Sequence, residues 1–174
     1  MQIIFHIDLN AFFASCEVIT HPEYKNKPLV VGHDSKRGIV STASYEARKF
    51  GIHSAMPTYL AKEKCPHLII VEPHFDLYKK ISNSFFSIVR QYSSIIEVAS
   101  IDECYVDMTN ACEKYGGIYE TAVTLQREVY SVTGISCSIG ISPNKFLAKM
   151  ASDMKKPMGI TILTRRNIKE LLWL

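Results

Sequence analysis

The sequence contains no hydrophobic run long enough to cross a bilayer. Its longest uncharged apolar stretches, residues 68–71 among them, fall far short of the roughly 20 residues that a membrane-spanning helix needs. A signal peptide is also missing, because no basic region precedes the apolar residues 3–7 and a carboxylate already stands at position 8. We therefore expect no membrane among the partners of this protein.

Paired cysteines are missing as well. The five cysteines are an odd number, they are widely spaced, and none belongs to a C-x-x-C pair. This pattern argues against a disulfide framework and against a structural zinc site. It favours a reducing compartment, so we expect a cytoplasmic protein.

Internal repeats and low-complexity segments are absent too. What is present is a chain of 174 residues, of which 47% are hydrophobic. This is enough to bury a core in one domain or in a compact pair of lobes. The apolar fraction excludes disorder as the overall description.

The formal net charge of +3 is distributed unevenly along the chain. Residues 74–140 carry five lysines and arginines against eight aspartates and glutamates, whereas residues 141–174 carry seven against two. An acidic middle beside a basic end fits a phosphate-handling protein with metal-binding carboxylates. A solvated basic helix face is the alternative, and on charge alone it is the commoner one.

The first half of the chain is predicted to contain short elements. Residues 3–7 form a continuous apolar run, which is typical of a strand buried on both faces. The next roughly 60 residues carry two short strands at 29–31 and 39–42, and short helices near 12–16 and 45–50. These residues are an insertion after the first strand.

The second half is more regular. Apolar residues recur every three or four positions over residues 76–92 and from Ile118 to Val132, which predicts two amphipathic helices, the first capped by Asp76. Ser142-Pro143 is expected to start a third helix. Strands are expected at 95–101, 104–108, 137–141 and 159–163. The order predicts an α+β fold of the ferredoxin-like, split β-α-β kind.

Three acidic residues follow the predicted strands. Asp8 ends the first strand, and Asp102 with Glu103 occupies the hairpin turn. These strands are neighbours in the predicted sheet, so the carboxylates converge and require a hard cation such as Mg²⁺. Two such ions about 3.5–4 Å apart can activate an attacking hydroxyl and stabilise a leaving pyrophosphate. The alternative for Asp102 and Glu103 alone is that they are ordinary turn residues.

Side chains suited to phosphate stand in two other segments. Tyr45 and Arg48 share one short helix, Thr42 precedes it, and Lys156 lies just before the last strand. A guanidinium fork, hydroxyl groups and an ammonium group all suit phosphate oxygens. Surface solubility is the plainer alternative for each of them.

Five segments together resemble one known family. They are residues 8–17, 41–51, 100–107, 140–149 and 152–157. Their sequences, which include DLNAFFASCE, STASYEARKFG and SIDECYVD, are similar, in the same order, to successive motifs of the Y-family (DinB/UmuC-type) DNA polymerases. The polymerase IV-like branch is the nearest. Several motifs in register are far more specific than one short pattern.

The resemblance implies a division of the chain. Residues 1–13 and 74–165 would form the palm, and residues 14–73 a small inserted fingers subdomain. Residues 166–174 would begin a linker to a thumb. The thumb and little-finger domains of the family have no counterpart here, so we expect this chain to be a palm and fingers fragment.

The resemblance also implies a catalytic site with two Mg²⁺ ions, for which Mn²⁺ can substitute. Asp8 and Asp102 would bridge the ions, and Glu103 would complete the catalytic carboxylates. The carbonyl of Leu9 would ligate one ion.

A nucleotide site is implied beside it. Phe13 occupies the steric-gate position, where an aromatic ring excludes a ribose 2′-hydroxyl, and Phe12 would pack nearby. Without the resemblance both would be ordinary core aromatics. The residues that would hold the triphosphate are Thr42, Tyr45, Arg48 and Lys156.

The implied activity is DNA-directed, error-prone DNA synthesis across damaged templates. The implied partners are primer-template DNA, a deoxynucleoside triphosphate and, through the missing C-terminal region, a sliding clamp; we expect a monomer. One alternative is a catalytically weak nucleotide-binding fragment. Two others have less support: a palm-type nucleotide cyclase would have two glycines where Ser100-Ile101 stands, and an RNA-binding module would have aromatic residues over 137–141.

Overall fold

The computed structural model describes residues 1–172, and these residues form two compact units. The first, which we call the five-stranded unit, joins Met1–Asn10 to the chain from Ile81 onward. The second, which we call the inserted unit, is Ala11–Lys80. Part of the linker expected at 166–174, namely residues 173 and 174, lies outside the described residues.

The five-stranded unit is built on one mixed sheet of order β5-β6-β1-β7-β8. Its strands are β1 (Ile4–Leu9), β5 (Ile96–Ser100), β6 (Glu103–Asp107), β7 (Cys137–Ser142) and β8 (Ile160–Ile162). β1 is antiparallel to both β6 and β7, and β8 is parallel to β7. This order confirms the α+β class and the ferredoxin-like arrangement predicted from the sequence.

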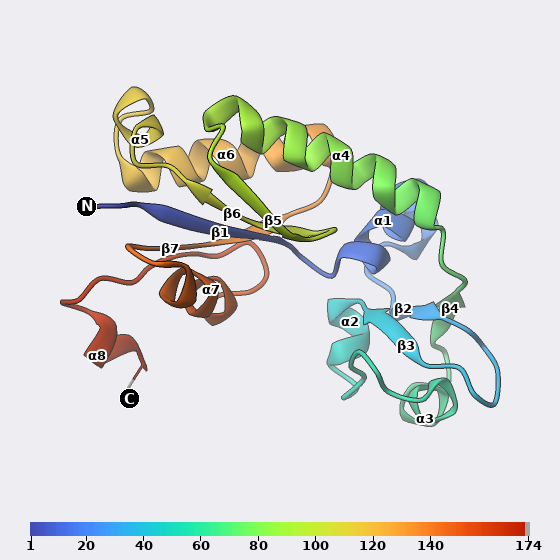
Figure 1. Ribbon diagram of the computed structural model, residues 1–174. Coiled ribbons are helices and arrows are strands. Elements are labelled where there is room, and N and C mark those ends of the chain that lie inside the picture. The colour runs from blue at the N-terminus through green and yellow to red at the C-terminus, as the bar shows by residue number, and fades with distance from the viewer. Residues whose placement is uncertain (173–174) are drawn as a thin grey trace. The chain divides into compact units, whose positions relative to one another are not determined.

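Helices cover both faces of this sheet (Figure 1). α4 (Phe75–Tyr92) and α6 (Ile118–Thr133) lie over one face, and α7 (Lys145–Met154) lies against the other. Two shorter helices are α5 (Ala111–Lys114) and α8 (Ile168–Leu172). All six residues of β1 are buried, as expected of a central strand that is covered on both faces.

The inserted unit has a three-stranded sheet of order β3-β2-β4. Its elements are α1 (Phe12–Thr20), the 3₁₀ helix η1 (Pro22–Tyr24), β2 (Leu29–Gly32), β3 (Val40–Ala43), α2 (Tyr45–Arg48), α3 (Thr58–Lys64) and β4 (Ile69–Val71). α3 and β4 were not predicted from the sequence. Its core is made mostly of small and β-branched side chains, namely Val30, Val40, Ala43, Ala47, Ile52, Met56, Ala61 and Cys65.

Helix α7 begins later than predicted. Its N-cap is Asn144, whose side chain accepts a hydrogen bond from the amide of Leu147 at 2.9 Å. Ser142 is instead the last residue of β7, where it is buried opposite Ile4 of β1. The prediction that Ser142-Pro143 starts the helix was therefore wrong, because strand pairing holds this serine.

Two other helical details differ from the prediction. α4 begins at Phe75, so Asp76 lies inside its first turn and does not cap it. On α6, Val132 is 61% exposed, whereas the neighbouring Thr133 is buried. Thr133 is held there by hydrogen bonds of its hydroxyl, which donates to the carbonyl of Val129 at 2.7 Å and accepts from the amide of Ile135 at 3.1 Å.

Among the residues that the structure describes, no helix is both long and apolar enough to cross a membrane. The five cysteines are all buried, and none of them forms a disulfide.

Candidate active site

Three carboxylates meet at one end of β1. Asp8 lies opposite Glu103 in the β1–β6 ladder, and the amide of Leu9 donates to the carbonyl of Asp102 at 3.0 Å. These backbone pairs bring one carboxylate oxygen each of Asp8, Asp102 and Glu103 to within 4.8 Å of one another. We call these residues the acidic cluster. Both Asp102 and Glu103 were expected in the hairpin turn. Glu103 is instead the first residue of β6, so of these two only Asp102 lies in the turn.

The electrostatics of the acidic cluster favour a cation. Burial raises the pKa of Asp102; a hydrogen bond from the Ser100 hydroxyl at 2.7 Å lowers it, and the charges of Asp8 and Glu103 raise it again. The donor atoms are all carboxylate oxygens. Leu9, whose carbonyl was expected to be a further ligand, is the last residue of β1. Hard oxygen donors whose charges repel one another fit Mg²⁺.

Two lysines offset part of the negative charge of the acidic cluster. The Nζ atom of Lys156 donates to Oδ2 of Asp8 and to Oδ1 of Asp153, the latter at 3.0 Å. Lys149, which was not singled out from the sequence, donates to Oε2 of Glu103 at 3.1 Å. Burial alone would lower the pKa of each ammonium group, but the hydrogen bonds and charges of these carboxylates raise it above the ordinary value.

His6 is a further neighbour of the acidic cluster that the sequence analysis missed. It stands two residues before Asp8, so both side chains lie on the same face of β1. The imidazole is fully buried, with Nδ1 2.6 Å from Oγ of Ser152 and Nε2 3.8 Å from Oε1 of Glu103. Burial lowers the pKa of His6, and the positive charge of Lys149 lowers it further, against the raising effect of Glu103.

Asn10 was also missed, and it anchors the loop that carries Lys156. Its amide group donates to the hydroxyl of Ser138 at 2.9 Å. Its carbonyl oxygen accepts from the hydroxyl of Ser136 at 2.9 Å and from the amide of Met158 at 3.0 Å. These bonds fasten the segment just after Lys156 to the end of β1. Nothing in the local pattern marked them, because their partners are far away in the sequence.

The two phenylalanines of the implied nucleotide site belong to the inserted unit. Phe12 is buried, whereas Phe13 is partly exposed. The ring of Phe13 stacks on Tyr78, with ring centroids 4.3 Å apart and an interplanar angle of 13°. The hydroxyl of Tyr78 donates to Oε1 of the buried Glu17 at 2.6 Å, which fixes the supporting ring.

Three other residues expected at the nucleotide site, Thr42, Tyr45 and Arg48, also lie in the inserted unit, whereas Lys156 lies in the five-stranded unit. The guanidinium carbon of Arg48 is 4.5 Å from the ring centroid of Tyr45, and Nε of Arg48 donates to the carbonyl of Ala43 at 3.0 Å. Arg48 as a whole is exposed to solvent. Thr42 lies half-buried on β3, opposite Val31.

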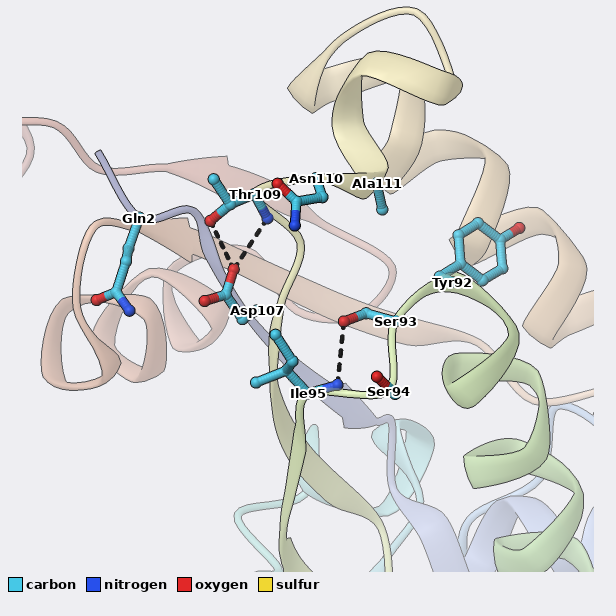
Figure 2. Close-up of a pocket in the computed structure, with 9 residues that line it drawn as sticks. All are labelled: Gln2, Tyr92, Ser93, Ser94, Ile95, Asp107, Thr109, Asn110 and Ala111. Atoms are coloured by element: carbon cyan, nitrogen blue, oxygen red, sulfur yellow. Dashed lines mark hydrogen bonds between the residues drawn. The ribbon is translucent and has the colours of Figure 1, made fainter.

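A separate cavity of about 470 Å³ lies in the five-stranded unit, away from the acidic cluster. Figure 2 shows the nine residues that line it, none of which was predicted to belong to a site. The carboxylate of Asp107 lies at its wall, where it accepts hydrogen bonds from the amide and the hydroxyl of Thr109 at 3.0 and 2.5 Å. These local bonds already occupy one oxygen of the carboxylate.

Comparisons with known sequences point to one family. A sequence model described as the impB/mucB/samB family matches residues 7–153. Among curated proteins, the chain is 48% identical over 174 residues to DNA polymerase IV of Bacillus velezensis. The match covers 99% of this chain and 42% of that protein.

Solved structures give the same result. A Y-family DNA polymerase chimera superposes with a TM-score of 0.91 and 35% sequence identity, over 98% of this chain and 51% of the chimera. An insertion ternary complex of Dbh DNA polymerase superposes with a TM-score of 0.87 and 36% identity, over 98% of this chain and 51% of that one. The chain thus spans about half the length of the proteins it matches.

Proposed function

Because the chain belongs to the impB/mucB/samB family, we propose that it is the palm and fingers part of a DNA polymerase of the Y-family, polymerase IV type. The single observation that carries the proposal is the acidic cluster, in which three carboxylate oxygens lie within 4.8 Å of one another at the end of the central strand. The reaction would be the transfer of a nucleotide from a deoxynucleoside triphosphate to the 3′-hydroxyl of a DNA primer.

We assign residues 1–13 and 74–165 to the palm, 14–73 to the fingers, and 166–174 to the start of a linker. The division of the described residues into two compact units supports this assignment, although the units separate at Asn10 and at Lys80. On this assignment the acidic cluster belongs to the palm.

The acidic cluster would hold two Mg²⁺ ions, or Mn²⁺ in their place, through Asp8, Asp102, Glu103 and the carbonyl of Leu9. When bound, such ions supply charge neutralisation at the phosphate and a lowered pKa for the attacking hydroxyl. The protein's part is to fix the carboxylates. The β1–β6 ladder fixes Asp8 and Glu103, and the amide of Leu9 fixes the turn at Asp102.

Thr42, Tyr45, Arg48 and Lys156 would bind the triphosphate. Arg48 has an exposed guanidinium group that is oriented by Tyr45 and by the carbonyl of Ala43, which suits it to grip phosphate oxygens. Lys156 has a raised pKa, so it stays charged at neutral pH. It would move from Asp8 to a phosphate when nucleotide binds.

Phe13 would select deoxyribose by occupying the space of a ribose 2′-hydroxyl, with Phe12 packed beside it at a ring-centroid distance of 5.7 Å. The stack on Tyr78 supports this role, because a gate must be held rigidly in order to discriminate between sugars. We include synthesis across damaged templates, since the inserted unit comprises only Ala11–Lys80 and so small a unit would offer a limited surface to the nascent base pair.

The proposal extends to partners and location. Primer-template DNA would be bound largely by regions beyond this chain, and a sliding clamp would bind there as well. We propose a cytoplasmic monomer. The absence of a disulfide among the five buried cysteines supports a reducing compartment. Since the chain spans about half of its relatives, weak activity of the 174 residues alone is part of the proposal.

Calorimetric binding of a deoxynucleoside triphosphate with Mn²⁺ to the 174-residue chain tests the site. We expect binding by the unaltered chain and none by the double variant Asp8→Asn with Asp102→Asn. Glu97→Gln is the matched control, because Glu97 is an exposed carboxylate that pairs with Lys145 outside the acidic cluster. Unchanged binding by the double variant would remove the metal site from the proposal.

Primer extension across an abasic site tests the activity. It should be measured with the 174 residues alone and with a longer polypeptide that contains them. We expect clear extension only by the longer protein, and its loss in Asp102→Asn. Extension that survives this change would contradict the assignment.

A further inference from the structure

The buried His6 has a role that the proposed function does not yet use. Its ring lies in the interior of the five-stranded unit, between two neighbouring strands. On one side, the ring of Tyr105 on β6 lies with its centroid 4.8 Å from that of His6. On the other side, the partner of His6 on β7 is Gly140.

Gly140 lets helix α7 approach the sheet closely. A Cβ atom at this position would lie 2.0 Å from the carbonyl oxygen of Ala148 and 2.3 Å from the amide nitrogen of Ser152. Only the absence of a side chain makes this approach possible. The approach brings Oγ of Ser152 to 2.6 Å from Nδ1 of His6, so the ring is fixed at that nitrogen.

The position of the ring proton follows from the neighbours. Oγ of Ser152 lies 2.6 Å from Nδ1 of His6 and also 2.8 Å from the carbonyl oxygen of Lys149, but its single proton can be donated to only one of them. If the carbonyl took it, a neutral His6 would carry its own proton on Nδ1. The lone pair of Nε2 would then face the carboxylate of Glu103, which is electrostatically unfavourable.

The opposite arrangement is favourable. Ser152 donates to Nδ1, and the proton of His6 is on Nε2, 3.8 Å from Oε1 of Glu103. Nε2 is buried and has no hydrogen-bond partner. The carboxylate of Glu103 is the charged acceptor paired with it. The other oxygen of Glu103, Oε2, accepts from Lys149 at 3.1 Å.

We propose that His6 is a positioning residue that, with Lys149 on the other side, holds the carboxylate of Glu103 in the orientation required for cation binding. Ser152 and Gly140 on the neighbouring elements hold His6 in turn. This inference rests on the proposed function, because it takes Glu103 to be a ligand of the metal site. At 3.8 Å the contact is longer than a hydrogen bond, and we expect it to shorten when Glu103 binds a cation.

The first test is the tautomer of His6 in the unaltered chain. Long-range ¹H–¹⁵N correlation spectra of the 174-residue chain, labelled at histidine and assigned with His6→Gln, distinguish the two ring nitrogens. We expect Nε2 to carry the proton in the neutral ring. A neutral ring with its proton on Nδ1 would overturn the inference.

The second test is the affinity for Mn²⁺, measured by electron paramagnetic resonance. Loss of a group that orients a metal ligand weakens metal binding by about 10–100-fold, and we expect about tenfold in His6→Phe, which keeps a ring but removes both nitrogens. His6→Gln keeps an amide donor near the position of Nε2 and should recover most of the affinity. His67→Phe, in the inserted unit, is the matched control and should have no effect.

The outcomes separate the two proposals. Thermal unfolding of each variant shows whether the fold is retained, and a folded His6→Phe that binds Mn²⁺ as tightly as the unaltered chain would refute the role of His6. If His6→Phe does not fold, the tautomer and the His6→Gln affinity decide. If the unaltered chain binds no Mn²⁺, the proposed metal site fails, whereas the tautomer still tests the interaction of His6 with Glu103.

Discussion

Lys156 donates a hydrogen bond from Nζ to Oδ2 of Asp8, although the two residues are 148 positions apart in the sequence. Asp153 accepts a second bond from the same ammonium group at 3.0 Å. In this state the lysine neutralises a carboxylate that we assign to the metal site. We also assign the Lys156 side chain to triphosphate binding. Its positive charge should therefore oppose cation binding at the acidic cluster but favour binding of the triphosphate.

Lys156→Met should therefore change cation and nucleotide binding in opposite directions. Without nucleotide, the variant removes a positive charge from the acidic cluster, and Mn²⁺ affinity should rise by about fivefold, equivalent to about 1 kcal/mol. Affinity for the triphosphate should fall. Calorimetry measures both, with Lys155→Met as a control because Lys155 is the exposed neighbouring lysine. Weaker Mn²⁺ binding in Lys156→Met would contradict the competition.

Gly140→Ala should destabilise the five-stranded unit. The added methyl group would meet the backbone of α7 at 2.0 Å, and backbone cannot move as readily as a flexible side chain. We expect a loss of about 1–3 kcal/mol in the free energy of unfolding, the usual cost of overpacking. Denaturant titration measures it. Gly116→Ala is the comparison, since no atom lies within 4 Å and only its positive φ of 87° opposes the change; an equal loss in both variants would show that close packing is not the cause.

Tyr78→Phe should destabilise the inserted unit. The change removes one hydrogen bond from Oε1 of the buried Glu17, which keeps its contact with Nδ1 of His74 at 2.7 Å. The other oxygen, Oε2, already lacks a hydrogen-bond partner. A hydrogen bond to a charged group contributes about 1.5–3 kcal/mol, and we expect a loss of this size in denaturant titration. Tyr130→Phe removes the same hydroxyl from a side chain that is 52% exposed and should have little effect.

The buried thiols should make stability depend on pH in the alkaline range. Burial raises the pKa of Cys104 from its ordinary value of 9.0 to about 12, and burial also raises the pKa of Cys137. Above pH 9 the unfolded chain therefore releases protons that the folded chain retains, so the free energy of unfolding should fall as pH rises. Cys104→Ala should reduce this slope. A slope that is unchanged in the variant would count against the assignment to Cys104.

The same burial should protect the cysteines from modification. The thiolate is the reactive form, and the raised pKa values of Cys104 and Cys137 leave little of it at pH 8. A disulfide reagent should react slowly with the native chain. After unfolding it should react rapidly with all five cysteines. Fast reaction of Cys104 before unfolding would contradict the prediction.

Much of the five-stranded unit was predictable because hydrophobic periodicity reports burial directly. The continuous apolar run before Asp8 gave a strand whose residues are all buried, and the acidic cluster followed from strand order alone. Predictions from sequence spacing were wrong where strand pairing or a side-chain hydrogen bond fixed the residue. Strand pairing took Ser142 from the predicted cap, and hydroxyl bonds of Thr133 displaced Val132 from the buried face of α6.

Three supporting residues could not be predicted, for a different reason. His6, Asn10 and Lys149 acquire their roles through partners more than 40 positions away in the sequence, and a local pattern does not encode such contacts. His6 depends on the close approach of α7 at Gly140, which becomes visible only once the helix is placed on the sheet. Its alternation with Asp8 on β1 was the one available signal.

The inserted unit separates β1 from the other strands of its sheet in the sequence. This separation costs the sheet little stability. The entropic cost of closing a loop grows only with the logarithm of its length, so doubling an insertion adds about 0.6 kcal/mol. Ala11–Lys80 can therefore lengthen, shorten or be exchanged for another sequence at little expense to the ladder that pairs Asp8 with Glu103. Substrate preference, if the inserted unit sets it, is free to diverge while the acidic cluster stays the same.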